Sequence, residues 1–179
     1  MPPEAFWGRY AEMEERIRAT AAVLPSYGVA GWGGLVMIGD WQWENEQLVS
    51  IGLAHGAPAD ESKLHVHTTV RDPTADVTSL RMAAVRPAWD DKDEMLRRLR
   101  EFGTVAGESS TIAVDAAPVE FTVWGEAGRW WAAGHHDGFG LVLEGQRIPI
   151  GRVELVRIQD LDPYLAGRRA YLRALRGES

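Results

Sequence analysis

The side chains best suited to chemistry in this sequence are five histidines, which fall in three places: His55, the pair His65 and His67, and the adjacent His135 and His136. Histidine titrates near neutral pH and is the commonest metal ligand in proteins. A His-x-His spacing on a strand turns both imidazoles toward one face, because side chains alternate along a strand. His65 and His67 are therefore the candidate ligands of a divalent metal such as zinc, nickel or iron.

Strand pairing limits this candidate site to two histidines. A hairpin that pairs Leu53 with Leu64 keeps one face apolar, and it puts His55 on that face and His65 and His67 on the other. A metal would need a carboxylate from elsewhere in the chain, which the sequence does not name. The alternative is an ordinary half-solvated strand face. Small residues of the neighbouring strand face the two imidazoles and leave room for water or a ligand: Ser50, Gly52 and Ala54.

Other catalytic chemistry has little support in the sequence. The chain has no cysteine, which excludes thiol nucleophiles, thiolate zinc sites and iron–sulfur clusters. No G-x-S-x-G motif surrounds a serine, and the glycine-rich stretch 31–34 precedes a strand pattern, whereas a phosphate loop precedes a helix. We therefore expect no cofactor and favour a protein that is not an enzyme, with a metal-dependent enzyme or a small-ligand protein at His65 and His67 as the alternative.

Eight tryptophans in 179 residues indicate either a tryptophan-rich core or a contact surface. Trp41 and Trp43 lie two residues apart, so a strand would carry both on one face, beside the acidic Asp40 and Glu44. These four residues form the predicted binding patch. Core packing is the alternative role for most of the tryptophans.

The charge of the chain also constrains its partners. Its net charge of −7 disfavours nucleic acid, because affinity for phosphate backbones depends on lysine and arginine. No apolar run approaches the ~18 residues of a membrane span, and the amino terminus lacks a secretory signal pattern, so we expect a cytoplasmic protein. The leading functional hypothesis is a non-catalytic binding module with a basic protein partner, a class that includes immunity and chaperone roles.

Hydrophobic periodicity predicts the elements that carry these residues. Helices are expected over residues 4–24, from Asp90 or Asp91 to about Phe102, and from Asp160 to Arg176, where we expect the arginines to form a solvated face. Strands are expected over 34–39, 48–54, 64–70, 80–85, 111–115, 119–124, 129–134, 139–143 and 153–158.

Short connections favour antiparallel hairpins. Residues 119–143 should form a three-stranded meander, with turns that set Val123 opposite Trp130 and Gly134 opposite Leu141. We therefore predict one α+β domain over 1–179, with about eight or nine mostly antiparallel strands in a sheet or half barrel and three flanking helices. Each half, 1–87 and 88–179, reads as a helix followed by strands, which suggests a weak pseudo-duplication.

Overall fold

The computed structural model of this chain describes residues 3–20, 23–57, 61–77, 97, 106–126 and 128–178. Within these ranges nine strands form one sheet with the order β1-β9-β5-β6-β7-β8-β4-β3-β2. All neighbouring strands pair antiparallel except β5 and β9, which are parallel, so the sheet is mixed. The strands are β1 (Ser26–Val29), β2 (Leu35–Glu44), β3 (Gln47–Ala57), β4 (Ser62–Thr69), β5 (Glu108–Val114), β6 (Ala117–Glu126), β7 (Arg129–His136), β8 (Phe139–Gln146) and β9 (Glu154–Ile158).

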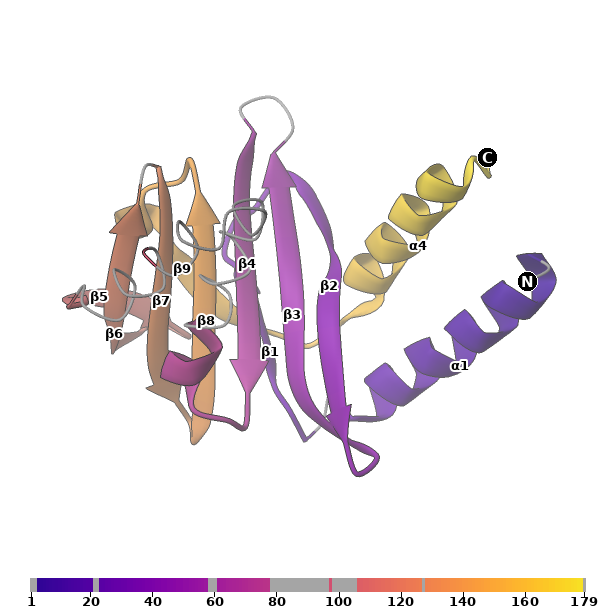
Figure 1. Cartoon of the computed structure of the whole chain (residues 1–179), viewed down its shortest axis with the longest axis horizontal. Coiled ribbons are helices and arrows are strands. Elements are labelled where there is room, and N and C mark those ends of the chain that lie inside the picture. The colour runs from indigo at the N-terminus through magenta and orange to yellow at the C-terminus, as the bar shows by residue number, and fades with distance from the viewer. Residues whose placement is uncertain are drawn as a thin grey trace.

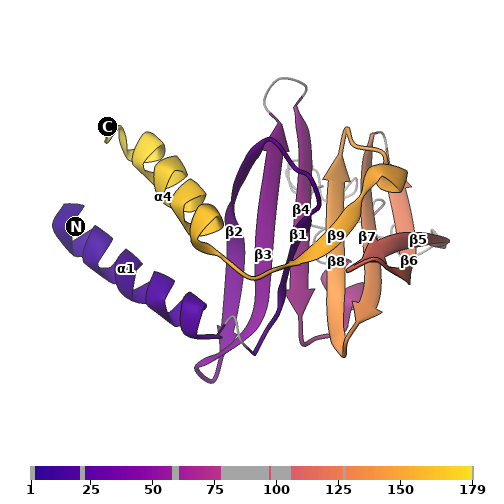
Figure 2. The ribbon, with the colours of Figure 1, turned by 180° about the vertical axis from the view of Figure 1, so that it is seen from behind.

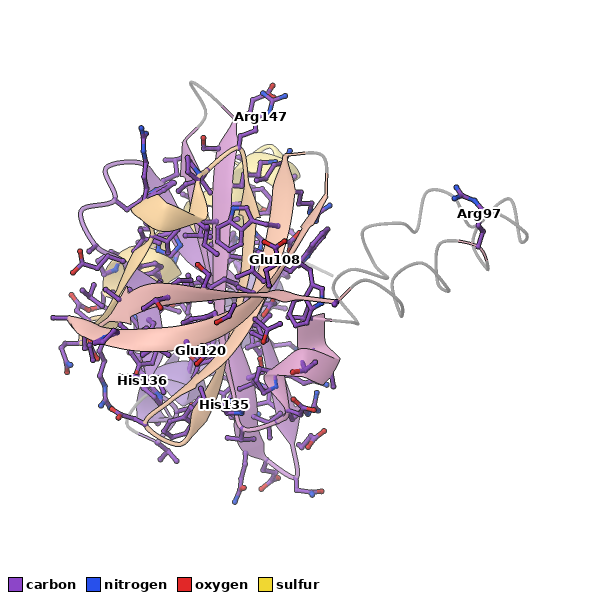
Figure 3. All side chains as sticks on the ribbon, turned by 90° about the vertical axis from the view of Figure 1, so that its left-hand side faces the viewer. Arg97, Glu108, Glu120, His135, His136 and Arg147 are labelled. Atoms are coloured by element: carbon purple, nitrogen blue, oxygen red, sulfur yellow. The ribbon has the colours of Figure 1, made fainter. Side chains whose placement is uncertain are left out.

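The sheet curls into a half barrel, as predicted (Figure 1). Seen from the β5–β6 side, these two strands run steeply across the others (Figure 3). Helices α1 (Pro3–Thr20) and α4 (Asp162–Arg176) lie side by side near β2, and the chain passes from β9 across the inner face of the sheet to α4 (Figure 2). A short helical segment over 73–77 lies on the outer face. No described helix has the length and apolar character of a membrane-spanning helix.

The inner face of the curled sheet holds most of the core. One cluster fills the half barrel between β1, β4, β5, β6, β7, β8 and β9 and includes the fully buried Phe121 and Leu143. A second cluster packs β2 and β3 against the two helices and includes Ile38, Leu53 and Leu165. On the outer face, Val77 of the short helix covers Trp131 and Val142.

Most of the predicted strands are confirmed, with changes at their ends. β2 continues to Glu44, and β1 had no counterpart in the prediction because its four residues carry no useful periodicity. The first helix ends at Thr20, whose carbonyl accepts the backbone N–H groups of Val23 and Leu24 in a turn. The strand expected over 80–85 lies outside the described residues, as does the helix expected to end near Phe102 apart from Arg97.

Two predicted hairpin registers are wrong by two residues. Leu53 pairs with Val66, where Leu64 was expected, because the ladder extends to the pair Ala57 and Ser62. In the meander, Val123 pairs with Ala132, where Trp130 was expected. There the last pair is Glu126 with Arg129, and Gly128 adopts a φ of +79°, so the turn lies one residue later than expected. A slip of two residues leaves every side chain on its predicted face.

The β7–β8 register is confirmed, with Gly134 opposite Leu141. The three strands of the meander are neighbours in the sheet, as expected.

Helix α4 covers the free edge of β2. A Cβ atom at Gly167 would overlap the carbonyl oxygen of Val36, so only glycine allows the helix backbone this close. The next residue, Arg168, donates from Nη1 to the carbonyl oxygen of Gly39 at 3.2 Å. An uncovered edge would expose unpaired backbone groups to other chains, and α4 prevents this.

The arginines of α4 were expected to form a solvated face, but several contact α1. Arg169 pairs with the buried Glu14 at 2.5 Å, and the Arg173 guanidinium lies 5.4 Å from the Trp7 ring centroid. Burying the Glu14 carboxylate without a compensating charge would be costly. Arg169 therefore turns toward α1 and pairs with this carboxylate. At the other end of the two helices, Arg18 of α1 donates to Asp162 of α4 at 2.9 Å.

His55 links four elements at the inner face. Its Nδ1 donates to the carbonyl oxygen of Leu64 at 3.2 Å, while Nε2 accepts the backbone N–H of Val29 at 3.3 Å and lies 3.2 Å from the Tyr164 hydroxyl. The side chain is almost completely buried, and burial lowers its pKa to about 4. The neutral ring therefore joins β1, β3, β4 and α4.

We expect Gly167→Ala to destabilise the protein, because the added methyl group must push α4 away from β2. The loss should be about 2 kcal/mol, even though alanine favours a helix by about 1 kcal/mol over glycine. Gly8→Ala in α1 is the matched control, because a Cβ there meets nothing within 4 Å, and it should be neutral or stabilising. Urea denaturation of both variants measures the difference; equal effects would contradict the close contact.

We expect His55 to make stability pH-dependent. Because its folded pKa lies below the unfolded value of ~6.5, the unfolded chain binds the extra proton, and stability falls as the pH drops from ~6.5 toward 4. Between pH 7 and 5 the wild type should lose about 2 kcal/mol more than His55→Gln, which does not titrate. Urea midpoints at the two pH values test this, and parallel pH profiles of the two proteins would refute it.

Candidate functional site

The outer face of β3 carries only small side chains, which form the floor of the candidate site. They are Ser50, Gly52, Ala54 and Gly56. As expected from the sequence, they lie opposite the two imidazoles: Gly52 pairs with His67 and Ala54 with His65. The face therefore has room above β3 for the side chains of β2 and β4.

His67 and Asp40 meet directly above this floor. His67 Nδ1 of β4 lies 3.3 Å from Asp40 Oδ1 of β2, although β3 separates the two strands. A Cβ atom at Gly52 would lie 2.6 Å from Asp40 Oδ1 and 2.7 Å from His67 Nδ1. Glycine at this position therefore provides the space in which the pair forms.

Asp40 reaches this face because of an irregularity in β2. Strict alternation would put Ile38 and Asp40 on the same face, yet Ile38 is buried on the inner face. The ladder between β2 and β3 shifts register between these two residues, which moves Asp40 to the outer face. Strict alternation along the strand therefore does not predict this pair, and the glycine at 39 is the only local signal of the irregularity.

A cavity of about 480 Å³ adjoins the pair. His67 is 7% exposed, and its Nε2 has no hydrogen-bond partner among the described residues. Asp76, from the helical segment over 73–77, also lines the cavity. Ser50 lines it too, but its hydroxyl makes no hydrogen bond to His67. The remaining lining residues are Trp41, Gln42 and Val142.

The charges around His67 favour its protonated form. Burial alone would lower the pKa of His67, but the hydrogen bond to Asp40 and the negative charges of Asp40, Glu144 and Asp76 outweigh burial and raise it. Burial alone would raise the pKa of Asp40, yet the hydrogen bond and charge of His67 lower it. In its protonated form the ring donates from Nδ1 to Asp40 and holds a second donor, Nε2–H, without an acceptor among the described residues.

His65 does not complete a metal site with His67. The two ring centroids are 6.0 Å apart, and burial together with the charge of His67 lowers the pKa of His65. No group of three histidine, aspartate or glutamate side chains is placed to share an ion within the described part of the chain. The carboxylate that a three-ligand site requires is therefore not supplied by these residues.

The predicted binding patch is divided between the two faces of the sheet. Trp41 and Trp43 share the inner face and pack partly buried against the second core cluster, whereas Asp40 lies on the outer face. Glu44 forms an ion pair with Arg71, which also donates to Gln42 Oε1. Much of the surface of both tryptophan side chains is therefore used in core packing.

The adjacent His135 and His136 do not line the cavity beside His67. They lie on β7 at the end of the sheet opposite Arg147 (Figure 3), where His135 pairs with Gly140 of β8. His136 pairs across the turn with Phe139, and its ring contacts Tyr27 edge-on with centroids 5.8 Å apart. Comparisons of this chain with protein-family models, with curated proteins and with solved structures found no match.

We expect Gly52→Ala to separate Asp40 from His67, because the new methyl group occupies the space between them. The pKa of His67 should fall by about one unit or more once burial is no longer offset. The fold should survive, since alanine is favoured over glycine in a strand by about 0.5–1 kcal/mol. NMR titration of the ring nitrogens measures the pKa.

Gly56→Ala is the matched control for this prediction. It lies on the same strand and face, and a Cβ there meets nothing within 4 Å. It should leave the titration of His67 unchanged. An unaltered pKa in Gly52→Ala would show that Asp40 does not set the charge of His67.

Proposed function

We propose that this protein binds a small, uncharged polar molecule in the cavity beside His67. The observation that carries the proposal is the buried Nε2 of His67, which has no hydrogen-bond partner in the described part of the chain and belongs to a ring held by Asp40. A buried donor without an acceptor costs about 1–3 kcal/mol, so a ligand that supplies an acceptor gains that free energy on binding. The cavity volume of about 480 Å³ falls within the range of small-molecule sites.

The charges of the cavity select the kind of ligand. Asp40 and Asp76 are acidic, and His67 is the only base among the described lining residues, so an anion would meet net negative charge. A suitable ligand is uncharged and offers both an acceptor and a donor. An amide does so, because its carbonyl oxygen accepts from His67 Nε2–H and its N–H donates to Asp76. The proposed ligand is therefore a small molecule that bears a carboxamide or an equivalent pair of groups.

The two hypotheses from the sequence are less well supported than this proposal. A metal at His65 and His67 lacks a third ligand among the described residues. For the basic protein partner, the predicted patch offers little free aromatic surface, since the Arg168 and Arg16 guanidinium groups already lie over the rings of Trp41 and Trp43. A basic partner stays a prediction.

We expect acetamide to bind with a dissociation constant on the order of millimolar, as suits so small a probe. Saturation-transfer NMR detects the bound probe, and the ring ¹⁵N resonances of His67 report where it binds. His67→Gln and Asp40→Asn should weaken binding about tenfold, because each removes the oriented Nε2–H donor. Binding should also decline as the pH rises through the pKa of His67, since the ring then loses that proton.

Two comparisons make this test specific. Acetate should bind more weakly than acetamide because of the acidic lining, and His135→Gln, which changes an exposed residue outside that lining, should bind acetamide like the wild type. Equal acetamide binding by the wild type and His67→Gln, or none by either, would disprove the proposal.

A further inference from the structure

A second cavity, of about 470 Å³, lies between the outer face of β2–β4 and α4. Its lining is largely apolar and includes Leu35, Met37, Ala54, Ala170 and Tyr171. Leu35 is 69% exposed and Tyr171 is 45% exposed, which are high values for large apolar side chains. Apolar surface that gathers around a hollow is typical of a binding site.

The packing of α4 and the composition of β3 create this hollow. Gly167 brings the helix backbone against the edge of β2, so that Ala170 and Tyr171 form one wall. The Arg168 guanidinium lies 5.7 Å from the Tyr171 ring centroid and also donates to Gly39, which links this wall to the strand. Ala54 and Gly56 form the floor and are too small to fill the space.

The polar groups of this cavity differ from those beside His67. Among the described residues, Lys63 is the only charged side chain in the lining, and it makes no ion pair with any of them. His65 lies next to it on the same strand, and burial lowers its pKa, so the ring is neutral at pH 7. The cavity therefore combines an apolar body with a positive charge and a neutral hydrogen-bonding group.

We propose that this cavity binds an amphipathic monocarboxylate, with its apolar chain against Leu35, Met37 and Tyr171 and its carboxylate at Lys63. The site is separate from the one beside His67. The contact between Asp40 and His67 lies over Gly52, between Ser50 in one cavity and Ala54 in the other. The two proposals thus rest on different residues and different ligand chemistry.

Calorimetry with decanoate tests this proposal, and two probes with the same chain serve as references: decanol and decyltrimethylammonium. All three are used below the concentration at which they aggregate. Decanoate should bind most tightly and decyltrimethylammonium least, because Lys63, the one charged side chain among the described lining residues, is positive. Amide resonances of Leu35, Ala54 and Ala170 should shift on binding and place the probe.

Two substitutions separate the apolar and ionic contributions. Ala170→Trp fills the mouth of the cavity and should abolish binding of decanoate and decanol, whereas Ala166→Trp, on the same helix but outside this lining, should bind both normally. Lys63→Glu should weaken the binding of decanoate by about fivefold or more, leave the binding of decanol unchanged and strengthen the binding of decyltrimethylammonium. Both Lys63 and Ala166 are exposed, so these variants should fold.

Acetamide binding by the same variants separates the two proposals. It should stay at the wild-type value, because Lys63 and Ala170 do not line the cavity beside His67. Three results would overturn the assignment of this cavity, whatever the result with acetamide. They are a wild type that does not bind decanoate, an Ala170→Trp variant that still binds it, and a Lys63→Glu variant that binds it as tightly as the wild type does.

Discussion

The two faces of β3 carry side chains of very different size, and both the core and the candidate sites depend on this difference. Ile51, Leu53 and His55 point inward and are each about 1% exposed. The residues between them, such as Gly52 and Ala54, are too small to cover the outer face. Because a strand exposes its faces alternately, this one segment seals the interior and leaves a furrow outside. Side chains from β2 and β4 then meet across the furrow, as Asp40 and His67 do.

Helix α4 turns that furrow into enclosed space at one end. The helix can lie against the edge of β2 only because Gly167 has no side chain, and its contact serves two purposes. It protects an edge strand from pairing with other chains, and it raises Ala170 and Tyr171 beside the outer face as the wall of the second cavity. On the inner face, Leu165 and Tyr164 from the same helix contribute to the core and to the hydrogen-bonded neighbourhood of His55. Stability and candidate function therefore share the same helix.

Sequence patterns predicted the faces of the sheet better than its contacts. The placement of His55 inside and of His65 and His67 outside was correct, even though the predicted register was off by two residues, because an even slip preserves the face. The pairing of His67 with Asp40 was beyond such patterns. It depends on a register shift near Gly39, which breaks the alternation on which the prediction relied. The parallel contact between β5 and β9 joins segments about 40 residues apart and leaves no local trace in either.

The sequence by itself determined the periodic features of this protein: most of its strands, its first and last helices, the apolar and polar faces, and the small residues opposite two imidazoles. These features follow from local backbone geometry, which repeats every two or 3.6 residues and is therefore visible in a linear pattern. Only the tertiary structure decided which carboxylate meets His67, that Trp41 and Trp43 face the core, and that Gly167 brings α4 against β2. Each of these contacts joins residues from different elements, and a single irregular residue or a change of helix position alters it while the local pattern stays the same.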